Sequence, residues 1–386
     1  MKIVQCITRM ILGGAQEVIV MTCDALVRDG HEVTLVHGPT EGPEGSLLAE
    51  ARATGATLIE EPTLIRPVQP RTDWRCRGAL RRLFTELKPD VVHTHSSKAG
   101  IVGRSAAWAA GVPCVVHTVH GLGFHDRQRP IVRQAYIRSE RWAAKRCHHL
   151  IAVSPQMVEA FERHGIVPRE KMTIIPSAVD LSRFDRKPSD RAEAKRTLGI
   201  DDDAPTVGIL ARLDLHKGHF DLLRALPGLI ESHPKLMAVF IGDGFDRGII
   251  EARIDDLNLT DRVRLPGLVP RDRVPGLLDA IDVSVLPSYQ EGQSITLLQS
   301  LLRGCGIVAY ETGGIPSVCI DGQTGRLVPA GDTAALADAI RRMLDHPEER
   351  AELVEHGQAL ARYHFAPKRM TDATTAVYER VLNQRS

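Results

Sequence analysis

The sequence has few aromatic residues and no long apolar run. Aromatic side chains make up 4% of the 386 residues, against 43% hydrophobic and 25% charged. No stretch approaches the roughly 20 consecutive apolar residues that cross a bilayer as a helix, and the composition is typical of a globular chain. The apolar residues after Met1 run into a turn at Gly13, without the longer core and cleavage site of a signal peptide. We therefore expect a cytoplasmic protein whose length favours two domains.

Paired cysteines are missing as well. An odd number of cysteines, widely spaced, argues against a disulfide framework and against a zinc cluster. Those that lie in apolar runs are expected to be buried thiols in a reducing compartment. The seven cysteines are Cys6, Cys23, Cys76, Cys114, Cys147, Cys305 and Cys319.

The sequence also lacks a recognisable metal-binding set. His93 and His95 would share one face of a strand, which suits a metal, but no third ligand follows at a recognisable spacing. The acidic run 201–203 precedes a proline, and we interpret it as a solvated turn. We predict no metal and no other cofactor.

Short β-branched runs alternate with helical stretches, and this series occurs twice. Apolar strands separated by helices predict a parallel sheet covered on both faces. We expect a first domain over 1–184, a second over 185–365, and a C-terminal helix over 366–386 that returns to the first domain. The expected strands are 2–7, 32–36, 91–94, 114–118, 150–153 and 173–176, then 206–210, 236–241, 263–265, 283–286 and 307–309.

The second series carries a cationic loop. Arg212 follows the strand that ends at residue 210, and Lys217 and Gly218 open the next helix. Loop cations and the free N–H groups of a helix N-terminus both attract negative charge, so this arrangement commonly binds a diphosphate. Taken singly, Arg212 and Lys217 would be ordinary surface charges.

A later strand of that series ends in an acidic glycine turn. Glu291 and Gly292 follow the strand 283–286, and Ser294 can cap the helix after them. Gly292 allows close backbone approach, and the capped helix offers N–H groups to an anion. The Glu291 carboxylate can accept hydrogen bonds from sugar hydroxyls.

Together these segments resemble the retaining glycosyltransferase family 4 of the GT-B fold, in which two doubly wound, Rossmann-like α/β domains face each other across a cleft. The order and spacing match over about 206–332, and more weakly elsewhere. The matching residues are Arg212, Lys217 and Gly218; Gly242, Asp243 and Gly244; Asp282, Pro287, Ser288, Glu291 and Gly292; and Gly313, Gly314, Ile315, Pro316, Gly322 and Gly325.

The resemblance implies a role for each part of the donor site. The two cations would neutralise the donor diphosphate, Glu291 would hold the transferred sugar as a catalytic residue, and the first amides of the capped helix would contact phosphate. The implied donor-binding residues are Gly14, Arg212, Lys217, Gly242, Glu291, Gly292, Ser294, Ile295 and Gln299.

One position departs from the family pattern. Gln299 stands where the family typically has a second glutamate that binds the ribose. A neutral acceptor weakens a hydrogen bond from about 1.5–3 to about 0.5–1.5 kcal/mol. Donor affinity would fall roughly fivefold to tenfold, which leaves the site in place.

The first half offers a facing set of residues. Gly13 and Gly14 lack the G-x-G-x-x-G spacing of a dinucleotide enzyme and form either a tight turn or, as the resemblance implies, a contact near donor phosphate and acceptor. Ser97 and Lys98 open a helix and predict an anion site for a phosphorylated acceptor, with a plain helix cap as the alternative. His120 precedes a flexible glycine segment; the resemblance implies a catalytic contact with donor sugar or acceptor, and a structural histidine is the alternative.

A basic, amphipathic stretch suggests one further partner. The segment 127–146, from Arg127 to Arg146, interleaves arginines with apolar residues, and Trp74 with Arg75, Arg77, Arg81 and Arg82 extends it. Such a helix lies on an anionic membrane or simply covers its own sheet. The first 184 residues carry 24 Lys+Arg against 18 Asp+Glu, the rest 25 against 30, so the first half has the sign that suits an anionic surface.

The sequence therefore predicts a metal-independent glycosyltransferase. It would move a hexose or N-acetylhexosamine from a nucleoside-diphosphate sugar to a glycan or polyprenyl-phosphate-linked acceptor in cell-surface polysaccharide synthesis, at the inner face of the plasma membrane. No nucleic-acid partner is expected. The alternatives are a sugar-nucleotide 2-epimerase of the same fold and a non-catalytic sugar-nucleotide-binding subunit, which Gln299 would favour.

Overall fold

The computed structural model describes residues 1–40, 42, 44–125, 128–185 and 191–384. The chain forms two compact units: Met1–Ala178 with Pro367–Ser386, and Val179–Ala366. We call these unit 1 and unit 2. Their boundary follows Ala178, where the sequence analysis places it after residue 184.

Unit 1 is built on a parallel sheet of seven strands in the order β3-β2-β1-β4-β5-β6-β7. The middle strands are buried on both faces, which is why they read as apolar runs in the sequence. The strands are β1 (Lys2–Ile7), β2 (Glu32–His37), β3 (Thr57–Glu60), β4 (Val91–His95), β5 (Cys114–Val119), β6 (His149–Ala152) and β7 (Met172–Ile174).

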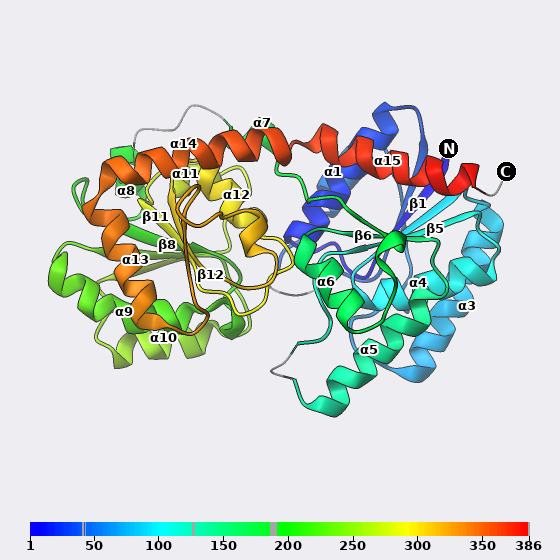
Figure 1. The fold of residues 1–386 in the computed structure, drawn as a ribbon, viewed down its shortest axis with the longest axis horizontal. Coiled ribbons are helices and arrows are strands. Elements are labelled where there is room, and N and C mark those ends of the chain that lie inside the picture. Colours follow the sequence, from blue (N-terminus) through cyan, green and yellow to red (C-terminus); the bar gives the residue numbers. More distant parts are fainter. Residues whose placement is uncertain (41, 43, 126–127, 186–190, 385–386) are drawn as a thin grey trace. The chain divides into compact units, whose positions relative to one another are not determined.

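Helices cover both faces of this sheet. Neighbours α3, α4 and α5 lie on one face, and α1 lies beside the C-terminal helix α15 on the other (Figure 1). The helices are α1 (Gly14–Arg28), α2 (Leu48–Ala53), α3 (Pro70–Leu87), α4 (Ser97–Ala109), α5 (Pro130–Ala144), α6 (Pro155–Arg163) and α15 (Pro367–Asn383). Among the described residues, no helix combines the length and the apolar character that a bilayer crossing requires.

Unit 2 repeats the plan with a parallel sheet of six strands in the order β10-β9-β8-β11-β12-β13. Its strands are β8 (Thr206–Leu210), β9 (Met237–Ile241), β10 (Val263–Gly267), β11 (Val283–Leu286), β12 (Gly306–Tyr310) and β13 (Arg326–Val328). Its helices are α7 (Leu181–Phe184), α8 (Arg191–Thr197), α9 (His219–Ser232), α10 (Arg247–Asp256), α11 (Val274–Leu278), α12 (Ile295–Leu302), α13 (Thr333–Asp345) and α14 (Pro347–His364).

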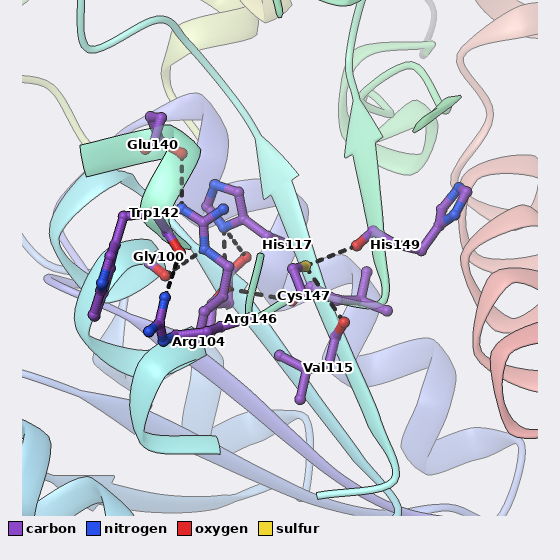
Figure 2. A network of polar contacts seen from close by, with 11 residues as sticks. Gly100, Arg104, Val115, His117, Glu140, Trp142, Arg146, Cys147 and His149 are labelled. Carbon is purple, nitrogen blue, oxygen red and sulfur yellow. Dashed lines mark hydrogen bonds and ion pairs between the residues drawn. The ribbon is translucent and has the colours of Figure 1, made fainter. Parts of the chain in front are cut away.

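Buried ion pairs tie helices together within each unit. In unit 1, Figure 2 shows Arg104 of α4 reaching Glu140 of α5, with a nitrogen–oxygen distance of 2.8 Å, while its Nε donates to the carbonyl of Gly100. In unit 2, Arg303 holds Asp279 through two hydrogen bonds of 2.8 and 2.7 Å. All seven cysteines are buried and none is in a disulfide.

Strand order reverses once in each sheet. The reversal lies between β1 and β4 in unit 1, and between β8 and β11 in unit 2. In open α/β sheets, ligands bind beyond the carboxyl ends of the strands at such a point. The loops that follow these four strands are therefore where we look for the site.

Candidate active site

In unit 2 the structure brings the predicted cation and carboxylate together. Lys217 ends the short 3-10 turn Leu215–Lys217 after β8, and Glu291 follows β11. The Nζ of Lys217 lies 2.6 Å from Oε1 of Glu291. Their side chains are 16% and 11% exposed, so the pair is shielded enough for charge to matter and remains open to a ligand.

Two glycines in left-handed conformations allow these loops to touch. A Cβ on Gly218, at φ +78°, would lie 1.9 Å from the carbonyl oxygen of Pro287. A Cβ on Gly313, at φ +48°, would lie 2.0 Å from the carbonyl oxygen of Glu291. Both positions exclude any side chain. The loops after β8, β11 and β12 therefore meet backbone to backbone around Glu291.

The other predicted donor residues line the same edge. Gly242, after β9, abuts the loop after β8, because its Cβ would lie 2.1 Å from the Ala211 oxygen. The side chain of Arg212 is 38% exposed, and its Nη2 lies 3.7 Å from Oδ2 of Asp214. The other carboxylate oxygen of Asp214, Oδ1, lies 2.5 Å from Nδ1 of His216. Asp214 is a site residue that no sequence pattern marked.

Helix α12 begins next to Glu291 as predicted. The hydroxyl of Ser294 accepts a hydrogen bond from the N–H of Leu297 at 3.3 Å, which confirms the cap, and Ile295 is the first helical residue. Gly292 is buried in the turn before the helix. Gln299 lies on the same helix and is only 6% exposed.

In unit 1 the start of α4 shows strain and an ion pair. Ser96 adopts φ +61°, which is uncommon for a residue with a side chain. Its hydroxyl does not cap α4 and instead lies 2.7 Å from the hydroxyl of Thr8. Beyond the half-buried Ser97, Lys98 directs its Nζ to Oδ1 of Asp73 at 2.5 Å. An anion at this site would compete with Asp73 for Lys98.

A groove lies next to Ser97 and Lys98. It has a volume of about 380 Å³ and runs between α3, α4 and α5. Apolar and aromatic side chains dominate the wall beyond the lysine. They include Val68, Trp74, Ile101, Tyr136 and Trp142.

All three tryptophans of the protein are exposed on unit 1. Trp74 is 75% exposed, Trp108 43% and Trp142 42%. Trp142 also stacks under the guanidinium of Arg146, 4.0 Å from the ring centroid (Figure 2). Arg127, the first residue of the predicted basic segment, lies outside the described residues.

The two histidines considered as metal ligands have other partners. His93 bonds the hydroxyls of Tyr378 at 2.6 Å and Thr118 at 2.7 Å. His95 bonds Gln5 at 2.7 Å. Within the described ranges, no group of three or more His, Cys, Asp or Glu residues could hold a metal ion.

His120 follows β5 directly, is partly buried and contacts this group. Its Nε2 lies 2.9 Å from Nδ1 of His95. Burial lowers the pKa of His120 to about 4 and that of His93 to about 3, and it holds the pKa of His95 well below the usual range. These imidazoles are therefore neutral near pH 7 and act as hydrogen-bonding groups without charge.

Sequence reasoning missed several residues at the unit 1 edge. Gln5 is fully buried among the apolar residues of β1. A polar residue within an apolar run is visible in the sequence, so Gln5 could have been identified as a candidate. Tyr378 and Asp73 could not be identified from the sequence, because their partners lie far away in sequence. Gly14 is the first residue of α1.

Comparison with known proteins agrees with this geometry. A model described as "Glycosyltransferase Family 4" matches residues 12–183, and one described as "Glycosyl transferases group 1" matches 190–360. A UDP-Gal:alpha-D-GlcNAc-diphosphoundecaprenol alpha-1,3-galactosyltransferase of Escherichia coli is 30% identical over 338 residues, covering 87% of this chain and 86% of that protein. The chain belongs to glycosyltransferase family 4.

This glycosyltransferase also resembles a second curated relative and two solved structures. A D-inositol 3-phosphate glycosyltransferase of Actinosynnema mirum is 28% identical, covering 95% of this chain and 92% of that one. Among solved structures, Anabaena HepE in complex with UDP and glucose matches with a TM-score of 0.86 at 21% identity, covering 98% of this chain and all of that one. Sucrose-phosphate synthase from Thermosynechococcus elongatus matches at 0.85 and 22%, with both chains fully covered. The likeness to the solved structures shows the GT-B fold. Membership of the family shows that the protein is a transferase.

Proposed function

We propose that this enzyme transfers a hexose or N-acetylhexosamine, with retention, from a nucleoside-diphosphate sugar to a lipid-linked or glycan acceptor in cell-surface polysaccharide synthesis. The observation that carries the proposal is the Lys217–Glu291 pair at the strand-order reversal of unit 2. The E. coli relative is named for a UDP-galactose donor and a diphosphoundecaprenol-linked acceptor, which supports both substrate classes.

Charge explains how the donor site would work. The Lys217 ammonium contacts the Glu291 carboxylate. It would also contact a diphosphate bound at the loop after β8, and would so reduce the repulsion between the two anions. Arg212 and the N-terminus of α12 add positive potential on the leaving diphosphate. We propose that these groups replace a divalent metal, so a chelator should leave turnover unchanged.

The sugar would be held by neutral contacts. Glu291 would accept hydrogen bonds from hydroxyls of the transferred sugar, and Gln299 would contact the ribose through its amide. His120 would contact the donor or acceptor sugar. We assign no covalent nucleophile.

The groove of unit 1 suits an acceptor with a charged head and an apolar tail. Lys98 would bind the acceptor phosphate in place of Asp73, and Trp74, Ile101 and Trp142 would contact the lipid. Exchanging one carboxylate for a phosphate keeps the lysine paired, so the competition costs little. We also propose that the groove surface, together with Arg81 and Arg82 of α3, contacts an anionic membrane. Exposed tryptophans and arginines favour a bilayer interface.

A turnover panel tests the function. The enzyme is incubated with UDP-galactose, UDP-glucose, UDP-N-acetylglucosamine or GDP-mannose, with a polyprenyl-diphosphate-linked N-acetylglucosamine or a soluble glycan as acceptor. We expect a mass increase of one sugar on the lipid-linked acceptor and an α-anomeric coupling in the product. Conversion of the donor without acceptor would indicate an epimerase, and binding without any turnover would indicate a non-catalytic subunit.

Matched variants connect the activity to the site. Lys217→Met should lower kcat/KM roughly 10²–10³-fold, the effect of removing one preorganised cation or donor from a transition state. The control is Lys235→Met, because Lys235 is 61% exposed and pairs with Asp203 in the exposed turn. Equal activity of the two variants would reject the site.

Sedimentation with liposomes tests the membrane contact. Vesicles that contain anionic lipid should bind the protein at low salt, and Arg81→Glu with Arg82→Glu should reduce the bound fraction. Arg341→Glu, an exposed charge reversal in unit 2, should leave the bound fraction unchanged. No binding of the wild type at low salt would remove this part of the proposal.

A further inference from the structure

A chain of hydrogen bonds runs through the interior of unit 1 to His120. It starts at Tyr378 in α15, whose hydroxyl accepts from Nε2 of Gln5 in β1 at 3.2 Å. Oε1 of Gln5 lies 2.7 Å from Nε2 of His95 in β4, and Nδ1 of His95 lies 2.9 Å from Nε2 of His120. Gln5 and Tyr378 are fully buried and His95 is 2% exposed, so water does not compete for the bonds among these three residues.

The direction of each bond follows from what each atom can do. A carbonyl oxygen only accepts, so His95 must carry its hydrogen on Nε2. Burial holds the pKa of His95 well below its usual range, so the ring is neutral and has a single N–H. Its Nδ1 therefore accepts, and Nε2 of His120 must donate.

This fixes the state of the last ring in the chain. His120 is neutral as well, since burial lowers its pKa to about 4. With its hydrogen on Nε2, its Nδ1 carries a lone pair. No hydrogen bond to that Nδ1 is found within the part of the chain that the structure describes.

We infer that Gln5 and His95 are positioning residues that hold His120 in the tautomer protonated on Nε2, so that its Nδ1 accepts a hydrogen bond from a sugar hydroxyl. The inference rests on the proposed function, because it requires His120 to touch a sugar. The opposite tautomer would present an N–H at that point, and an imidazolium would present only donors.

Tyr378 is the partner of the Gln5 NH₂ group. Its hydroxyl accepts from the Gln5 amide and donates to Nδ1 of His93 at 2.6 Å, while Nε2 of His93 bonds Thr118 at 2.7 Å. With this amide group facing Tyr378, Oε1 of Gln5 faces Nε2 of His95. The C-terminal helix thereby takes part in setting the protonation of a residue at the end of β5.

Nitrogen-15 NMR of histidine-labelled protein tests the inference without any substrate. His120→Asn identifies the His120 signals among the 16 histidines. In the wild type we expect a pyridine-type signal for Nδ1 of His120 and a pyrrole-type signal for Nε2, with the same pattern for His95. Hydrogen on Nδ1 of His120 in the wild type would overturn the inference.

Kinetics of Gln5→Met and Tyr378→Phe supply a second readout. Each should mix the His120 tautomers and lower kcat about fivefold to tenfold, the effect of one hydrogen bond. Affinity for the nucleoside diphosphate alone should stay unchanged, because unit 2 binds it. Unaltered tautomer and kcat in both folded variants would overturn the inference.

The control variant is His149→Gln. His149 is another buried histidine of the same sheet and contacts Arg380 of α15 at 3.0 Å, but it lies outside the chain to His120. This variant should keep the His120 tautomer and kcat. If the wild type shows no turnover with any donor, the proposed function fails while the NMR result still decides the tautomer.

Discussion

Beyond β8 and β11, unit 2 presents a cation and a carboxylate, Lys217 and Glu291, which are partly exposed and 2.6 Å apart. At the ends of β4 and β5, unit 1 presents neutral imidazoles, the buried His95 and the partly buried His120, which are 2.9 Å apart. The same fold thus offers a charged edge in one unit and a neutral polar edge in the other. Charge suits a diphosphate, whereas neutral hydrogen-bonding groups suit sugar hydroxyls.

The charged edge and the neutral edge also differ in the free energy of the groups that form them. The Lys217–Glu291 pair is open enough to exchange one partner for a ligand. A buried neutral imidazole is held only by its hydrogen bonds, and protonation in the interior would require a charge without solvent. The charged edge should therefore respond to ligands, and the neutral edge to pH.

The largest difference that we expect between the units is the loss of stability at acid pH. The folded pKa of His93 is about 3, and burial holds those of His95 and His117 well below 6.5. Below pH 6.5 the unfolded chain binds protons that the folded unit does not, so the free energy of unfolding falls as pH falls. The loss approaches roughly 1.4 kcal/mol per pH unit for each such histidine, and it is absent above pH 6.5.

The tryptophans allow this to be measured for unit 1 alone. Trp74, Trp108 and Trp142 all lie in unit 1, so fluorescence during urea unfolding at pH 7.0 and 5.0 reports on that unit, and hydrogen exchange of β8–β13 reports on unit 2. We expect a much larger loss in unit 1, since among described residues of unit 2 only His219 shows such a lowered histidine pKa, about 4. Equal losses would contradict the account.

Removing the carboxylate of a buried ion pair should destabilise both units by a similar amount. Each contains a buried ion pair, Arg104–Glu140 in unit 1 (Figure 2) and Arg303–Asp279 in unit 2. Glu140→Ala and Asp279→Ala each leave a buried arginine without its carboxylate, which costs about 3–5 kcal/mol. Differential scanning calorimetry should show a lower Tm for both. A loss below about 1 kcal/mol, the value of an exposed pair, would show that the interior is wetter than described.

The smallest effect concerns the donor ribose. Gln299→Glu restores a charged acceptor and should tighten nucleoside-diphosphate binding about fivefold to tenfold. Titration calorimetry of the wild type and the variant measures this. Weaker binding would mean that Gln299, which is only 6% exposed, has no ribose contact and that burial of a carboxylate dominates.

The strands buried on both faces could be predicted from the sequence. The structure confirms Lys2–Ile7, Thr206–Leu210 and Val283–Leu286 to the residue, because their apolar runs are bounded by turn residues. Two edge strands, Thr57–Glu60 and Arg326–Val328, were missed. They are partly exposed and short, so they carry no apolar run that would mark them.

The same contrast holds for the site. Lys217 and Glu291 could be placed together because each follows a strand, and parallel strands end at one edge. The chain from Tyr378 to His120 could not, since it joins residues up to 373 positions apart. His93 and His95 stood out in the sequence, but only packing shows that hydroxyl and amide partners occupy their nitrogens.

The roles of Lys217 and Glu291 are tested by calorimetric titration of the wild type, Lys217→Met and Glu291→Gln. The ligands are a nucleoside diphosphate and its sugar derivative, with the base that binds most tightly among UDP, GDP and ADP. We predict that Lys217→Met weakens both ligands about tenfold to a hundredfold. Glu291→Gln should bind the diphosphate at least as tightly as the wild type, since it frees Lys217, and should lose affinity only for the sugar derivative. Unchanged diphosphate binding by Lys217→Met, or equal weakening of both ligands by Glu291→Gln, would contradict the account.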